Sequence, residues 1–373
     1  ADRRSSSRRR SSARCSWLRA AELHALLGSP RATELAERVL ELAPDEGRAY
    51  ELLALRFLHE QRYADLVKIE RRRLQRSLPP TVEAASQRRL GLAFMRQLDQ
   101  AQLAERALQR ATELEPDSAM GWELYAESLF RSGQPERAAT AIERAIDLDS
   151  GRPELHAFAA EICRALGDTP GALEHIEEAL AVPQVSPAAL ERAGEVLSAL
   201  GRKSEAMSTL DRALSRIEQP ASRARVLVRL AQLAEEALAD PAAARRYAER
   251  AVEYVDSADA LWLLERLAGQ EHRAEDRLRL LLRLSALGEG RAEAPRIRLL
   301  AEIGRLEEAE QAAVALAERD GPGGLPVLAE VVEKIGDTLR LRTVLERLLA
   351  VSPSARPRLR LGQLLLAAGE LDG

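Results

Sequence analysis

The side chains that most often carry chemistry are few in this chain, and their spacing matches no catalytic motif. The sequence contains no HExxH and no CxxC, so the spacing of the common zinc sites is absent. Neither a GxSxG elbow nor a Ser-x-x-Lys motif occurs in a suitable context. We therefore expect no catalytic residues, no metal site and no cofactor. The residues considered were His24, His59, His156, His175, His272, Cys15 and Cys163.

One histidine and one cysteine are spaced so that they could cooperate. His156 and Cys163 are seven residues apart, so on a helix they lie on the same stripe. A ligand pair or a nucleophile–base pair could have this spacing. Both residues, however, occupy positions that other parts of the chain fill with large packing side chains, and we expect them to belong to the core.

Those other parts repeat. Gly133, Gly167 and Gly201 are 34 residues apart, and two sets of alanines follow the same period. A fixed period with small residues in fixed positions is typical of stacked helical hairpins. The alanines are Ala138, Ala172, Ala206, Ala145, Ala179 and Ala213.

The repeat resembles the tetratricopeptide repeat (TPR) family. In the unit at 118–150, Trp122, Tyr125, Ala126 and Leu129 form one helical stripe, a glycine ends that helix, and Ala138 begins the next stripe. Eight positions of this pattern match across three consecutive units. The resemblance implies an all-α, right-handed superhelical α-solenoid of stacked antiparallel hairpins, with about ten repeats and a final single helix.

Composition agrees with helices. Aromatic residues make up only 3% of the chain, and good helix formers dominate. We expect an Arg/Ser-rich disordered tail over 1–16, a regular array over 17–219 that is best defined at 118–219, divergent repeats over 220–320, and a last repeat with an unpaired helix over 321–373. The glycine-rich stretch 320–326 is the expected hinge.

In TPR proteins the first helix of each hairpin lines a concave groove, and the resemblance carries this over to particular positions here. Glu127, Glu161 and Glu195 would form a carboxylate ladder at the repeat period. A groove with one charge sign favours an oppositely charged ligand, so a partner protein or peptide with a basic segment is expected. The expected partner-binding residues are Glu123, Glu127, Arg131, Glu161, Arg164, Glu191 and Glu195.

The predicted function is that of a non-enzymatic protein–protein interaction scaffold or adaptor. Two alternatives stay open: a regulatory or sensor arm of a larger signalling protein or enzyme, and a self-associating assembly subunit. Leu361, Leu364 and Leu365 in the last helix would lack cover, which predicts contact of another domain or subunit with the C-terminal end.

Charge and cysteine content limit partners and location. The net charge is −4, but residues 1–14 hold six arginines and one aspartate, so the rest of the chain is net acidic. Nucleic-acid binding is therefore not expected along the array and is a weak possibility for the tail alone. No apolar run is long enough to span a bilayer, and the cysteine count suits a reducing compartment such as the cytoplasm.

Overall fold

A computed structural model describes residues 15–96, 100–238, 240–352 and 354–368, and every regular element among them is helical. The chain divides after Thr209 into two compact units. The Arg/Ser-rich segment 1–14 lies outside the described residues, and residues 15–26 form the first helix described.

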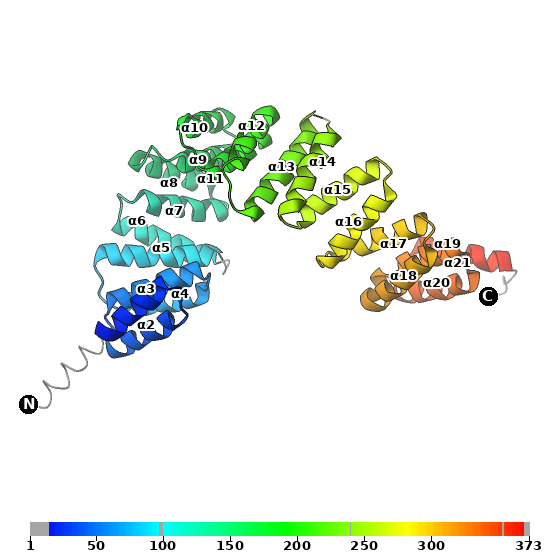
Figure 1. Cartoon of the computed structure of the whole chain (residues 1–373), viewed down its shortest axis with the longest axis horizontal. Helices are drawn as coiled ribbons and strands as arrows, with labels where there is room; N and C mark the ends of the chain where they lie inside the picture. The colour runs from blue at the N-terminus through cyan, green and yellow to red at the C-terminus, as the bar shows by residue number, and fades with distance from the viewer. Residues whose placement is uncertain (1–14, 97–99, 239, 353, 369–373) are drawn as a thin grey trace, which may run out of the picture. The chain divides into compact units, whose positions relative to one another are not determined.

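The first unit is a series of helical hairpins, and from Arg31–Leu42 to Pro187–Ala199 each helix packs on the next one in sequence (Figure 1). First helices of successive repeats also contact one another, as α5 does α7 and α9 does α11. After the helix at 15–26, the elements are α2 (Arg31–Leu42), α3 (Gly47–His59), α4 (Tyr63–Leu74), α5 (Pro80–Arg96), α6 (Ala101–Leu114), α7 (Ala119–Arg131), α8 (Pro135–Leu148), α9 (Pro153–Leu166), α10 (Thr169–Ala181), α11 (Pro187–Ala199) and α12 (Lys203–Leu214), which crosses the boundary between the units.

The 34-residue glycines end the first helix of three hairpins. Gly133, Gly167 and Gly201 all have positive φ angles, of 73°, 79° and 78°. This left-handed conformation is costly for residues with a Cβ, so glycine is the residue that stops the helix and turns the chain into its partner. The periodic glycines thus mark the turn within each hairpin, as the sequence pattern predicts.

Small residues let the two helices of a hairpin approach closely. Ala126, Ala138 and Ala145 are fully buried, and so are their counterparts one repeat later. In α5 the same role falls to Gly91, where a methyl group would overlap the buried side chain of Leu108. Burial of these positions confirms the packing role that the repeat pattern assigns to them.

The second unit continues the hairpin pattern with less regular lengths. Its core is built from leucine, isoleucine, valine and alanine side chains between 261 and 348. The elements are α13 (Pro220–Leu238), α14 (Pro241–Tyr254), α15 (Ala258–Gln270), α16 (Ala274–Ala286), η1 (Gly290–Ala292), α17 (Glu293–Glu302), α18 (Leu306–Asp320), η2 (Gly321–Gly323), α19 (Leu325–Ile335), α20 (Thr338–Val351) and α21 (Ala355–Ala368).

The described helices therefore follow one another as ten pairs and a final α21, and the all-helical α-solenoid is confirmed. The domain boundaries expected within it stay a prediction. The stretch expected as a hinge forms the short η2, and a Cβ on Gly324 would overlap the backbone of Ala317 in α18.

The last helix is better covered than its sequence suggests. Leu361 and Leu364 are half-buried and pack against the core of the second unit, because α21 lies on α20. The outward-facing leucines are instead Leu359 and Leu366, which are 67% and 58% exposed. No helix among the described residues is both long and apolar enough to cross a membrane.

Candidate functional site

The predicted partner-binding residues lie on three first helices of the first unit. Glu123, Glu127 and Arg131 belong to α7, the pair Glu161 and Arg164 to α9, and the pair Glu191 and Glu195 to α11. Arg131, Arg164 and Glu195 are exposed, and the other four are half-buried. The contact between α9 and α11 places the last four residues on neighbouring helices.

Arginines pair with several of these carboxylates. Glu127 Oε1 lies 3.7 Å from Arg131 Nη1 on the same helix. Glu123 Oε2 lies 2.9 Å from Arg152 Nη2, and Glu161 Oε2 lies 3.2 Å from Arg192 Nε. The last two pairs join one repeat to the next. The surface therefore presents carboxylates alternating with guanidinium groups, and its excess negative charge is smaller than the carboxylate ladder alone suggests.

Arg192 is also held by an aromatic ring. Its guanidinium carbon lies 4.6 Å from the centre of the Phe158 ring in α9. A cation over an aromatic face is attracted by the negative face of the ring. Arg192 is thus fixed between two neighbouring first helices, and its position depends on their packing.

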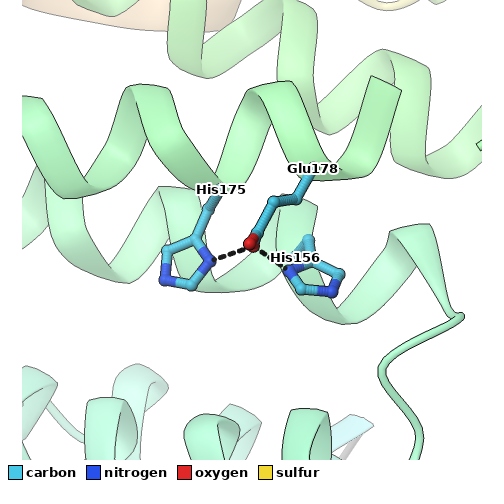
Figure 2. A group of neighbouring side chains, drawn as sticks. All are labelled: His156, His175 and Glu178. Carbon is cyan, nitrogen blue, oxygen red and sulfur yellow. Dashed lines mark ion pairs between the residues drawn. The ribbon is translucent and has the colours of Figure 1, made fainter. Parts of the chain in front are cut away.

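A second group of side chains gathers between α9 and α10 of the first unit. Figure 2 shows the Glu178 carboxylate between the rings of His156 and His175. Glu178 Oε2 lies 2.8 Å from His156 Nδ1 and 3.4 Å from His175 Nδ1. One ligand-type atom from each residue lies within 4.8 Å of the other two. We call His156, His175 and Glu178 the histidine–glutamate cluster.

The outer nitrogens of both rings face other acceptors. His156 Nε2 lies 3.1 Å from the backbone carbonyl oxygen of Ser150, and His175 Nε2 lies 3.2 Å from Glu143 Oε1 in α8. His156 is 6% exposed, whereas the Glu178 side chain is 49% exposed. The cluster therefore has a buried side and a side open to solvent.

Sequence reasoning missed this grouping because its members come from different helices. His156 lies in α9, at the core position expected for it, while His175 and Glu178 are one turn apart in α10. The local signal is the His-x-x-Glu spacing in a second helix, which by itself is common on helical surfaces. Among the described residues, this is the one group of three or more His, Cys, Asp or Glu side chains arranged to hold a metal ion.

Cys163, the other residue considered with His156, is not part of that group. Burial raises the pKa of the Cys163 thiol, and the nearby carboxylates of Asp168 and Glu143 raise it further. A thiol that stays protonated is a poor nucleophile. Its half-buried position fits the packing role that the repeat predicts.

A third polar group lies between α3, α4 and α5, and we call it the arginine–glutamate cluster: Glu51, Glu70, Arg73 and Arg89. Arg89 donates from Nε to Glu70 Oε1 at 2.5 Å and from Nη1 to Glu51 Oε1 at 2.8 Å. Arg73 Nη1 donates to Glu51 Oε2 at 2.8 Å. Here each carboxylate meets a guanidinium group.

The pKa values of the two glutamates in this cluster shift in opposite directions, although desolvation raises both. Desolvation raises the pKa of Glu70, which is 1% exposed, against the lowering effect of Arg89. Desolvation also acts on Glu51, but hydrogen bonds from Arg73 and the charge of Arg89 outweigh it and hold the pKa of Glu51 below its ordinary value. The cluster ties three helices of two repeats together.

Comparison with known proteins identifies the repeat. Residues 88–153 and 160–223 match the family model described as Tetratricopeptide repeat. The structure of the APC/C hetero-tetramer Cut9-Hcn1 is similar, with a TM-score of 0.51 and 17% identity over 72% of this chain and 52% of that chain. This chain therefore spans about half the length of that relative. No curated protein gives a significant match.

Two further solved structures have lower scores. YrrB, described as a TPR protein with an unusual peptide-binding site, has a TM-score of 0.40 and 20% identity over 47% of this chain and 88% of that chain. PilF of Pseudomonas aeruginosa has a TM-score of 0.46 and 20% identity over 57% of this chain and 94% of that chain. The family match identifies residues 88–153 and 160–223 as tetratricopeptide repeats, and the 34-residue glycines and the buried alanines agree with it.

Proposed function

We propose that this protein is a non-enzymatic scaffold that binds a partner protein or peptide on the surface formed by α7, α9 and α11. Consecutive tetratricopeptide repeats support a general role in protein–protein interaction. The observation that carries the more specific proposal is the row of charged side chains on successive first helices, from Glu123 in α7 to Glu195 in α11.

The proposed partner has a basic segment. Lysines or arginines of that segment would compete with Arg131 and Arg192 for Glu127 and Glu161 and would also contact Glu195. Exposed ion pairs contribute little each, so the partner must engage several carboxylates together. Such a surface selects the spacing of basic residues along the segment more than their number.

The proposed setting is the cytoplasm. Cys15 and Cys163 are both free thiols in the structure. Two unpaired cysteines are usual for proteins kept under reducing conditions. We also propose that the chain is not an enzyme, and the raised pKa of the Cys163 thiol supports this proposal.

Charge reversal tests the proposed surface. The full chain and its Glu127→Lys, Glu161→Lys, Glu195→Lys variant are applied to an array of synthetic peptides whose lysine and arginine content and spacing vary. We expect the native chain to bind a subset of basic peptides, and the variant to bind them about tenfold or more weakly, because several ion pairs of up to about 1 kcal/mol each are reversed.

A matched control carries the same charge change elsewhere. Glu113, Glu136 and Glu177 are exposed on the second helices α6, α8 and α10, and their triple lysine variant should bind like the native chain. Circular dichroism confirms that all three proteins keep their helicity. Equal binding by the two variants would contradict the assignment of the surface to α7, α9 and α11.

A second candidate role is self-association through α21. The exposed Leu359 and Leu366 favour it. They do not pack against the core as Leu361 and Leu364 do, so they leave apolar surface for another subunit. Static light scattering across a concentration series tests it. A molar mass that rises with concentration, and stays constant for a Leu359→Glu, Leu366→Glu variant, supports the role, and a constant mass for the native chain contradicts it.

A further inference from the structure

We propose that the histidine–glutamate cluster binds a divalent first-row transition metal ion, for which Zn²⁺ is the natural probe. The ligands are His156 Nδ1, His175 Nδ1 and a carboxylate oxygen of Glu178. This site is separate from the proposed partner-binding surface, and its test does not depend on the identity of any partner.

The hydrogen-bonding pattern fixes which nitrogens are available. A backbone carbonyl oxygen only accepts, so His156 Nε2, which faces the carbonyl of Ser150, must carry the proton. His175 Nε2 lies 3.2 Å from the carboxylate of Glu143, and we assign the proton to this nitrogen because the other one, Nδ1, makes no hydrogen bond with Glu178. In the neutral rings the lone pairs are then on the two Nδ1 atoms, which both face Glu178 Oε2.

Three electron-pair donors therefore converge on one point. Neither Nδ1 atom has a hydrogen-bond partner among the described residues, although both are buried. Neutral imidazole nitrogens beside a carboxylate oxygen repel it, and the arrangement becomes favourable when a cation lies between them. The structure thus contains buried, unpartnered ligand atoms that are directed at a common point.

The distances suit a small metal ion. Ligand atoms about 2.0–2.1 Å from a tetrahedral Zn²⁺ are about 3.3–3.4 Å from one another. The distance from His175 Nδ1 to Glu178 Oε2, 3.4 Å, matches this separation, and that from His156 Nδ1, 2.8 Å, is shorter. Two imidazoles and a carboxylate favour Zn²⁺, Co²⁺, Ni²⁺ or Cu²⁺, whereas Mg²⁺ and Ca²⁺ prefer oxygen ligands throughout.

The surroundings also have the features of a metal site. Ligating histidines commonly donate their other N–H to a carbonyl or carboxylate, and here the two acceptors are Ser150 and Glu143. The exposed side of Glu178 leaves a fourth position open to water or to a donor atom from a partner. A bound ion would link α9 to α10 and so stiffen this hairpin.

Metal titration of the full chain tests the site. After treatment with a chelator, ZnCl₂ is added in a calorimeter, with MgCl₂ as the comparison, and thermal unfolding is recorded with and without Zn²⁺. We expect one Zn²⁺ per chain, no response to Mg²⁺, and a midpoint of unfolding that rises with Zn²⁺. Co²⁺ should give the intense visible absorption of a four-coordinate site.

Ligand variants locate the binding. His175→Gln and Glu178→Gln should each weaken Zn²⁺ binding at least about 100-fold, and Glu143→Gln about 10- to 100-fold as an outer partner. Glu178 is half-exposed, so its variant should fold even where a buried histidine variant does not. The exposed His59→Gln variant and a Cys15→Ser, Cys163→Ser variant are matched controls that should bind Zn²⁺ like the native chain.

Loss of binding in Glu178→Gln and His175→Gln, with the controls unaffected, supports the site. Equal Zn²⁺ binding by the native chain and the Glu178→Gln variant would overturn the proposal, as would the absence of binding. In either case the cluster has a structural role only.

Discussion

The arginine–glutamate cluster and the histidine–glutamate cluster both join neighbouring helices in the first unit, but their donors and acceptors are balanced differently. In the first, two guanidinium groups donate to two carboxylates, and the bonds cross from α5 to α3 and α4. In the second, two imidazole nitrogens and a carboxylate oxygen face one another, and the nitrogens have no hydrogen-bond partner among the described residues.

The comparison separates a structural network from a ligand site. A buried group in which each carboxylate meets a guanidinium group needs no ligand from outside, and removal of one partner alone harms the fold because it leaves the other charge uncompensated. A buried group of acceptors that face one another needs a cation between them. Replacing one of these acceptors therefore weakens cation binding and can even stabilise the fold.

Arg89→Met should be the most damaging of these changes. It leaves Glu70, which is 1% exposed, without its guanidinium partner, and an uncompensated buried charge costs about 3–5 kcal/mol. Urea unfolding followed by circular dichroism measures the loss. Arg38→Met is the control, because the Arg38–Glu41 pair is about equally exposed on both sides and should contribute less than about 1 kcal/mol. Similar losses in both variants would show that the arginine–glutamate cluster is no more important than a surface pair.

Glu178→Gln should have effects of opposite sign with and without metal. In chelator-treated protein, the amide can donate to His156 Nδ1 and replace a repulsive contact by a hydrogen bond, so we expect a gain of about 1 kcal/mol in unfolding free energy. With saturating Zn²⁺, the variant should fall below the native chain. Thermal unfolding under both conditions measures this inversion. Destabilisation of the metal-free chain would instead indicate that the histidines carry protons toward Glu178.

The two glutamates of the arginine–glutamate cluster should respond oppositely to acid. Glu51 has a folded-state pKa below its ordinary value of 4.5, so its stabilising contribution is present above that pH and is lost as the pH falls through its folded pKa. Glu70 has a raised pKa, so the native state binds a proton before the unfolded state does, and its contribution improves as the pH falls toward 4.5.

Urea midpoints from pH 7 to pH 3 check these signs. The difference between the native chain and Glu51→Gln should shrink on acidification, and the native chain should gain relative to Glu70→Gln as the pH falls from neutral toward 4.5. Parallel pH profiles for the two variants would contradict the opposite shifts. The effect should be smaller than that of Arg89→Met, because Arg89 stays in place.

The sequence predicts the fold well because the repeat encodes it locally. Gly167 at the end of α9 and Ala172 in α10 each have one physical reason to be small, and both can be recognised by their spacing. Contacts between repeats are harder to predict. The pairs Glu123–Arg152 and Glu161–Arg192 are separated by 29 and 31 residues, not by the repeat period, so they follow only from the packing of the helices.

The histidine–glutamate cluster could not be predicted for a related reason. Its ligand atoms depend on the direction in which His156 in α9 and His175 in α10 point once the hairpin closes, and on a carboxylate from α8 that holds one ring. The sequence places His156 in the core, which is correct. It does not indicate which of the two ring nitrogens faces the neighbouring helix.

The most direct test is a crystal structure of the full chain grown with Zn²⁺, with diffraction recorded on both sides of the zinc absorption edge. We predict an anomalous peak within coordinating distance of His156 Nδ1, His175 Nδ1 and a Glu178 oxygen, with the Nε2 atoms still facing Ser150 and Glu143. An anomalous map without a peak between these three side chains would contradict the assignment of the cluster as a metal site.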